Sequence, residues 1–160
     1  MTHTIFAAVD NKPGVVSRVS GLFTRRGYNI ESLVTGVTDD ESIYKLTVVL
    51  NGTEEEKDLL VAQLERIQEV ISVSTLENTP FALSEMILIA IPASDDAARA
   101  RAAAFAKEHA LTLRQKTEKT LVYELCAPPE VLEEARLDTL QKFPGAYSVR
   151  SGAIGLAIEE

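Results

Sequence analysis

The feature of this chain that most restricts its fold is a single order of strand and helix patterns that occurs twice. In the first half, residues 4–9 form an apolar, β-prone run, and the apolar residues after them are spaced as one face of a helix that ends at Gly27. Residues 31–38 and 44–50 predict the two strands of a hairpin. Residues 53–76 add a helix, opened by a Thr-x-x-Glu capping box, and a last strand.

The second half follows the same order with different residues. The apolar run 86–91 predicts a central strand, and residues 94–109 predict an alanine-rich helix with an acidic start. Residues 112–126 predict a hairpin, and residues 128–145 predict a helix that opens on proline and stops at Pro-Gly. Residues 147–158 then predict one closing strand.

Each half therefore has the order β-α-β-β-α-β, in which two helices cover one face of a four-stranded sheet. We predict an α+β chain of two ferredoxin-like βαββαβ domains, one over residues 1–77 and one over residues 84–160, joined by a linker at residues 78–83. A sheet with helices on one face needs a cover for the other face. The sequence thus favours a homodimer.

Charge and hydropathy exclude several classes of partner. The formal net charge is −8 and the basic residues form no block, so nucleic acid is not expected as a partner. No run approaches the roughly 20 apolar residues that span a bilayer, and no signal-peptide pattern stands at the start, so we expect no membrane association and a cytoplasmic location. Cys126, the single cysteine, cannot form an intrachain disulfide, and we expect it to be a buried strand residue.

The titratable residues do not form a catalytic or metal-binding pattern. His3 lies near the flexible terminus and His109 at a predicted helix end, each without a partner nearby in sequence. The acidic clusters 39–41 and 54–56 fall in a hairpin turn and at a helix start, where acidic residues are ordinary. No glycine-rich nucleotide motif is present. We therefore predict no catalytic residues, no metal site and no enzyme activity in this chain.

Residues 11–16 are the best candidates for a binding site. They precede a helix N-terminus, whose free N–H groups and partial positive charge suit a carboxylate, and Gly14 allows a close approach. Asn11 and Asn29 each offer a donor and an acceptor, as the ammonium and carboxylate of an amino acid require. Ordinary turn chemistry, with Asn11 as a helix cap, explains the same residues. The residues alone leave both readings open.

The pattern N-x-x-G-x-x-S-R-x-x-G-L-F-x-x-R-G-Y-N-I-E-S-L, which runs from Asn11 to Leu33, resembles the small regulatory subunit of acetolactate synthase, a family with ACT domains. The block 26–33 followed by Thr38-Asp39-Asp40 is characteristic of that family, and the resemblance is close over residues 2–76. The second half is similar in length and topology. It has Arg150-Ser151-Gly152 where the family usually has Arg-Thr-Gly, and Leu111-Thr112-Leu113 replaces a strand in which the family often has Val-Asp.

The resemblance implies a noncatalytic subunit with an ACT domain at residues 1–77. Such a subunit activates the catalytic large subunit of acetolactate synthase in branched-chain amino acid biosynthesis and confers allosteric feedback inhibition by valine or a related branched-chain amino acid (leucine, isoleucine). Thiamine diphosphate, Mg²⁺ and FAD belong to the large subunit, so this chain is expected to hold no cofactor. The family's effector site lies between two ACT domains, and the matching positions here are Asn11, Lys12, Pro13, Gly14, Val15, Val16, Asn29 and Ile30.

Two other classes of function remain as alternatives. One is a freestanding ACT-type amino-acid sensor that acts on another enzyme or on transcription. The other is a ferredoxin-like enzyme such as an acylphosphatase, which would need an arginine phosphate loop or a placed catalytic histidine that this sequence lacks.

Overall fold

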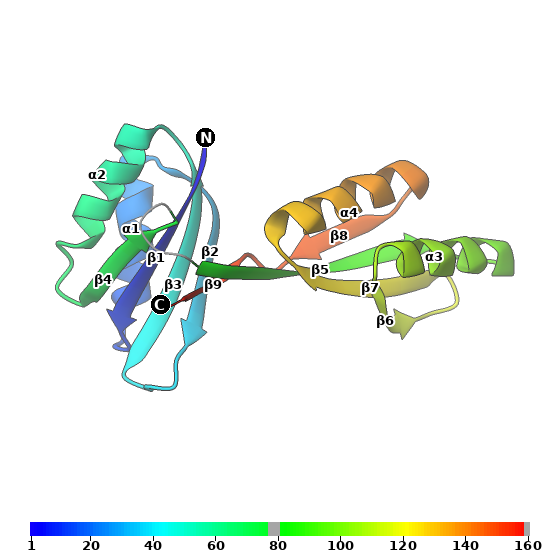
Figure 1. Cartoon of the computed structure of the whole chain (residues 1–160), viewed down its shortest axis with the longest axis horizontal. Coiled ribbons are helices and arrows are strands. Elements are labelled where there is room, and N and C mark those ends of the chain that lie inside the picture. Colours follow the sequence, from blue (N-terminus) through cyan, green and yellow to red (C-terminus); the bar gives the residue numbers. More distant parts are fainter. Residues whose placement is uncertain (77–80, 159–160) are drawn as a thin grey trace. The chain divides into compact units, whose positions relative to one another are not determined.

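A computed structural model describes residues 1–76 and 81–158. The first-half elements are β1 (Thr2–Asp10), α1 (Val15–Arg26), β2 (Asn29–Val37), β3 (Ile43–Asn51), α2 (Glu54–Leu64) and β4 (Val70–Thr75). They are followed by β5 (Phe81–Pro92), α3 (Asp96–Glu108), β6 (Thr112–Lys116), β7 (Thr120–Ala127), α4 (Pro129–Lys142), β8 (Tyr147–Arg150) and β9 (Ile154–Ala157). The predicted α+β class and the twofold βαββαβ order are confirmed (Figure 1).

The chain divides into two compact units. The first contains the described residues up to Leu83 and those from Ala153 onwards, and the second contains Ser84–Gly152. The predicted division put all of residues 84–160 in the second domain. Of the predicted linker 78–83, residues 81–83 are part of β5, and residues 78–80 lie outside the described part of the chain.

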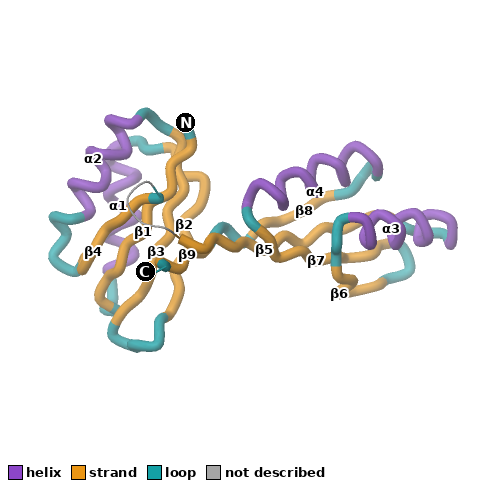
Figure 2. Tube along the Cα trace, in the orientation of Figure 1, coloured by secondary structure: helices purple, strands orange, loops and turns teal. Residues whose placement is uncertain are grey.

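The first unit has an antiparallel sheet in the order β2-β3-β1-β4, with α1 and α2 on one face (Figures 1 and 2). Helix α1 buries its apolar face and ends where Gly27 adopts a left-handed conformation and donates its N–H to the carbonyls of Phe23 and Thr24. The predicted capping box of α2 forms between Thr53 and Glu56. The core between sheet and helices comprises Ile5, Ala7, Val9, Val15, Val19, Phe23, Leu46, Val48, Leu50, Leu60 and Leu64.

The helix-free face of this sheet is partly covered by the same chain. The ring of Phe6 on β1 stacks on Phe81, with ring centroids 3.7 Å apart. Strand β9 pairs with β5, and Gly155 approaches Phe6 so closely that a Cβ on this glycine would lie 2.1 Å from the ring. Glycine is therefore required at this position by close packing.

The predicted closing strand 147–158 is two strands in the structure. Gly152, with φ 82°, interrupts it, so that β8 stays with the second unit and β9 joins the first. The break was not predicted from the sequence, because apolar and β-prone residues continue on both sides of it.

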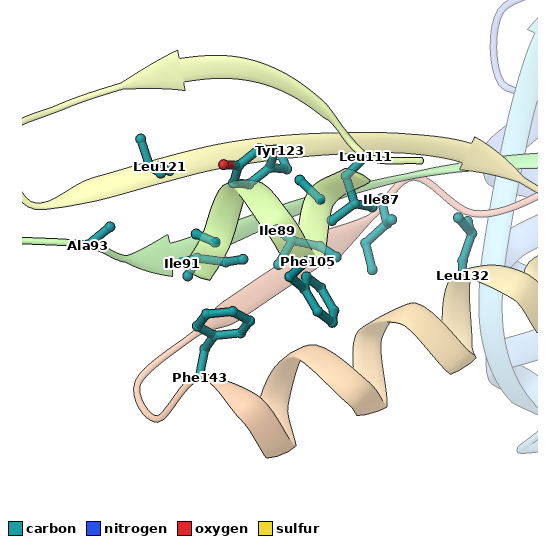
Figure 3. Packing of buried hydrophobic residues seen from close by; sticks show 12 residues of the cluster. Ile87, Ile89, Ile91, Ala93, Phe105, Leu111, Leu121, Tyr123, Leu132 and Phe143 are labelled. Atoms are coloured by element: carbon teal, nitrogen blue, oxygen red, sulfur yellow. The ribbon is translucent and has the colours of Figure 1, made fainter. Parts of the chain in front are cut away.

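The second unit has the sheet order β6-β7-β5-β8 and carries α3 and α4. Figure 3 shows its core, in which Phe105 of α3 meets Phe143 edge to face with centroids 5.2 Å apart. The core residues are Ile87, Ile89, Ile91, Ala93, Ala102, Phe105, Ala106, Leu111, Leu121, Tyr123, Leu132 and Phe143. Cys126, expected to be buried, is exposed, because it faces away from this core, opposite Met86 of β5.

A buried ion pair holds the end of β8 against β5. The Glu85 side chain is 5% exposed and accepts hydrogen bonds from Arg150 Nε at 3.0 Å and from the Gly152 N–H at 3.0 Å. Arg150 also contacts the second carboxylate oxygen of Glu85, and its Nη1 donates to Glu133 at 3.2 Å. The hydrogen bond to Glu85 raises the pKa of Arg150.

Both histidines have partners in the fold. His3, expected near a flexible terminus, is buried in β1, with Nε2 3.2 Å from the carbonyl oxygen of Gly52. His109 ends α3 as predicted, and its Nε2 lies 2.8 Å from Asp138 of α4. No helix in the described residues is long and apolar enough to cross a bilayer.

Candidate functional site

The turn between β1 and α1 leaves the start of α1 open. Gly14 is the N-cap residue and has φ 86°, a left-handed conformation that glycine adopts without strain. With no cap from a side chain there, the N–H groups of Gly14, Val16 and Ser17 and the positive end of the helix dipole are available to an anion, whereas the Val15 N–H donates to the carbonyl oxygen of Lys12 at 3.3 Å. An atom at the Cβ position of Gly14 would have Arg18 Nη2 as its nearest neighbour, at 4.0 Å, so the space beside the glycine is open.

Asn11 is fixed against the β2–β3 hairpin. Its backbone N–H donates to the carbonyl oxygen of Ser42 at 2.7 Å, and its Nδ2 donates to the carbonyl oxygen of Glu41 at 2.7 Å. The alternative reading, in which the Asn11 side chain caps α1, is not what the structure shows. These bonds occupy donors only, so Oδ1 is the atom that Asn11 can offer to an ammonium group.

Two cations flank the turn, and each has a carboxylate partner. Lys12 Nζ lies 2.5 Å from Asp10 Oδ2, and this contact raises the pKa of Lys12. Arg18 Nη1 lies 2.5 Å from Glu69 Oε1. The turn therefore has a locally balanced charge.

The predicted residues between these groups contribute in different ways. Val15 is 1% exposed, its side chain belongs to the core, and its N–H donates to the carbonyl oxygen of Lys12 at 3.3 Å. Val16 is half-buried and packs against the same core, and Pro13 has no N–H to donate. Ile30 packs partly against the core at the start of β2.

Asn29 lies at the opposite end of the sheet from Asn11. Asp10, just before Asn11, pairs with Ile43 of β3, whereas Asn29 pairs with Asn51 at the other end of β3. The eight steps along the strand from Ile43 to Asn51 span roughly 26 Å at about 3.3 Å per residue. One chain therefore does not bring Asn11 and Asn29 to the same ligand.

The acidic clusters have the structural roles that the sequence predicted. Asp40 accepts hydrogen bonds from the Ser42 hydroxyl at 2.6 Å and N–H at 2.9 Å in the hairpin turn, and these bonds lower the pKa of Asp40. Glu54, Glu55 and Glu56 form the first turn of α2. Within residues 1–76 and 81–158, no group of three or more His, Cys, Asp or Glu side chains is placed to hold a metal ion.

Two residues beside the turn, Arg18 and Glu69, were not among the predicted site residues. Arg18 stands four residues after Gly14, a spacing that puts both on the same side of the first helical turn. Glu69 gives no comparable signal, because it comes from the loop before β4 and reaches the turn only through the fold. Its backbone carbonyl also accepts the N–H of Asp10 at 2.8 Å.

The βαββαβ unit, with an open, glycine-started helix after its first strand, is a ferredoxin-like arrangement, and the family model that matches it places the first half in the class of ACT domains. The model of the "AHAS small subunit-like ACT domain" family matches residues 5–72. The acetolactate synthase small subunit of Mycolicibacterium smegmatis is 30% identical over 156 residues, which cover 98% of this chain and 91% of that protein. The chain therefore belongs to the acetolactate synthase small-subunit family, as the resemblance indicated.

Further comparisons add detail on length and fold. The chain is 38% identical over 98 residues to acetolactate synthase small subunit 2, chloroplastic, of Arabidopsis thaliana, and it spans only 20% of that longer relative. The crystal structure of the acetolactate synthase small subunit from Thermotoga maritima superposes with a TM-score of 0.84 at 22% identity, covering 100% of this chain and 99% of that one. This second likeness supports the fold over both units.

Proposed function

We propose that this chain is a noncatalytic regulatory subunit that activates the catalytic large subunit of acetolactate synthase and confers feedback inhibition by valine or a related branched-chain amino acid. Membership of the small-subunit family supports the assignment. Thiamine diphosphate, Mg²⁺ and FAD would then be held by the large subunit, and the pair would work in the cytoplasm. The effector would bind to this chain and act on the large subunit at a distance.

The amino-acid effector would first be held by its carboxylate. The N–H groups after Pro13 and the helix dipole of α1 offer an anion position, and Gly14 leaves it open. The ammonium group would be held by Oδ1 of Asn11 and by the Asn29 side chain, which can both accept hydrogen bonds. Because Asn11 and Asn29 of one chain lie at opposite ends of the sheet, the Asn29 side chain at this site would have to come from another chain.

A second copy of the chain is the economical source. Strand β2 is an edge of its sheet, so its outer N–H and C=O groups have no strand neighbour among the described residues of the unit. Val37, at the end of β2, is 81% exposed. A twofold axis that pairs two β2 edges antiparallel would set the start of one β2 beside the end of the other.

This pairing would bring the two asparagines to the same end of the joined sheet. Within one chain, Asn11 lies at the Val37 end of β2, since Val37 pairs with Tyr44 and Asn11 bonds to Glu41. The partner's Asn29 begins the antiparallel β2 and would arrive at that end. The separation of Asn11 and Asn29 along one sheet is the observation that carries the proposed dimeric site.

Mixing two single variants tests the dimeric site. We expect Asn11→Ala and Asn29→Ala each to weaken valine inhibition of the reconstituted enzyme by about 1–3 kcal/mol, or roughly 5- to 150-fold in valine concentration, since each leaves a charged ligand group short of a partner. A heterodimer of the two variants has one site without either asparagine and one intact site. When the two variants are co-expressed with different tags and the heterodimer is purified, we therefore expect part of the inhibition to return at the valine concentrations that inhibit the wild type.

The matched control pairs wild type with the double variant Asn11→Ala/Asn29→Ala. That heterodimer has the same composition, but each of its sites lacks one asparagine, so we expect no recovery. Equal curves for the two heterodimers would contradict a site shared between chains. A 17.4 kDa monomer by light scattering at micromolar concentration would do so as well.

A further inference from the structure

The guanidinium of Arg18 lies beside Gly14, the residue that starts α1. Its Nη2 is the nearest atom to the place that a Cβ of Gly14 would occupy, at 4.0 Å. Its Nη1 points elsewhere, to Glu69 Oε1 at 2.5 Å. A single guanidinium therefore spans from the loop before β4 to the open start of α1.

Glu69 holds the guanidinium in this place. The Glu69 side chain is 14% exposed, and its second oxygen, Oε2, is buried and has no hydrogen-bond partner among the described residues. Arg18 is thus the partner that the structure shows for the largely buried Glu69 carboxylate. Moving the Arg18 guanidinium into solvent would leave this carboxylate without its charged partner, so that movement is disfavoured. Because a guanidinium has five N–H donors, Arg18 can keep this contact and still donate through Nη2.

The other cation at the turn differs from Arg18, whose side chain is 56% exposed, in the shape of its charged group more than in its exposure. Lys12 is engaged by Asp10 at 2.5 Å, and its side chain is 67% exposed. An ammonium is a compact point charge, whereas a guanidinium is a planar fork that matches a carboxylate. Arg18 is the better fit for an α-carboxylate that already accepts hydrogen bonds from the start of α1.

We propose that Arg18 binds the carboxylate of the amino-acid effector, and that Glu69 is a positioning residue that aims Arg18 at Gly14. This inference rests on the proposed function and adds to it the source of specificity for a free α-carboxylate. The N–H groups of α1 supply only partial charge, and Arg18 supplies a full one. The site then favours an amino acid over its amide, which carries the same side chain and ammonium group.

The test compares L-valine with L-valinamide as inhibitors of the reconstituted enzyme. For wild type, we expect valine to inhibit at much lower concentration than valinamide. In Arg18→Gln, valine should weaken about tenfold or more, valinamide should change little, and the ratio between them should fall by a similar factor. Arg18→Lys keeps the positive charge but loses the planar guanidinium. Its ratio between valinamide and valine should lie between those of wild type and Arg18→Gln.

Two further variants separate binding from general damage. Arg101→Gln removes an exposed arginine from helix α3 of the second unit, and its curves should match wild type. The double variant Arg18→Gln/Glu69→Gln removes the carboxylate that Arg18→Gln alone leaves without its partner. Its ratio between valinamide and valine should stay as low as that of Arg18→Gln. Loss of fold would instead weaken both inhibitors alike and leave the ratio unchanged.

The possible failures are distinct. A wild-type ratio kept in Arg18→Gln, or restored in the double variant, would overturn the role of Arg18 while the proposed function stands. Absence of valine inhibition in the wild-type pair would overturn the proposed function, and this inference with it.

Discussion

The variant Gly14→Asp is expected to abolish inhibition by valine. The new carboxylate would stand at the anion position beside the start of α1, where it repels the effector's carboxylate and competes for the same N–H groups. The local cost to the fold is modest, because a Cβ at Gly14 meets no atom closer than 4.0 Å and aspartate tolerates the left-handed conformation at about 1 kcal/mol. The change therefore acts on the site more than on the unit.

The measurement is acetolactate formation by the reconstituted pair against increasing valine. Gly145→Asp is a matched control, since Gly145 has φ 82° and a Cβ there makes an ordinary contact of 3.6 Å with Pro92, far along the sequence from α1. We expect its valine curve to match wild type. If the valine curve of Gly14→Asp also matches wild type, residues 11–16 do not bind the effector and are only a structural turn.

The second large effect is expected for Arg150→Met in the second unit. Methionine fills part of the same space but leaves Glu85, with only 5% of its side chain exposed, without its charged partner. Breaking a buried ion pair in this way costs about 3–5 kcal/mol. The value should fall toward the lower end here, because the Arg150 side chain keeps 30% exposure and Glu85 retains the N–H of Gly152.

Hydrogen exchange of the β5 and β8 amides measures this loss within the second unit and does not require one two-state transition for the whole chain. Arg114→Met is the control. Arg114 makes a bidentate pair with Glu124 at 2.9 and 2.6 Å, but its side chain is 55% exposed, so we expect a change of about 0–1 kcal/mol. Equal effects of the two variants would show that Glu85 does not depend on Arg150.

The order of elements was predictable because local chemistry determines it in most places. Gly27 stops α1, Thr53 and Glu56 cap α2, and the near-continuous apolar run 86–91 forms the inner part of β5. Tertiary pairing determines the remainder. The break at Gly152 follows from β9 pairing beside β5 over Phe6, and a pattern of residues carries no record of which strand lies next to which.

The candidate site was predictable in part for the same reason. Asn11 and Gly14 are neighbours in sequence and remain so in space. Asn29 stands only 15 positions after Gly14, but the intervening helix α1, at about 1.5 Å per residue, carries the chain roughly 18 Å along the sheet. Sequence proximity therefore suggested one site where a single chain has two separated halves, and Glu69 entered the turn only through folding.

The most direct test of the regulatory assignment adds this chain to the purified catalytic large subunit from the same source. With pyruvate, thiamine diphosphate, Mg²⁺ and FAD present, we expect acetolactate formation to rise with added chain until it saturates, and valine to inhibit only when the chain is present. The chain alone should form no acetolactate. If the rate stays unchanged at saturating chain, valine has no effect and the two proteins do not co-purify, the assignment is contradicted, and a freestanding amino-acid sensor becomes the better description.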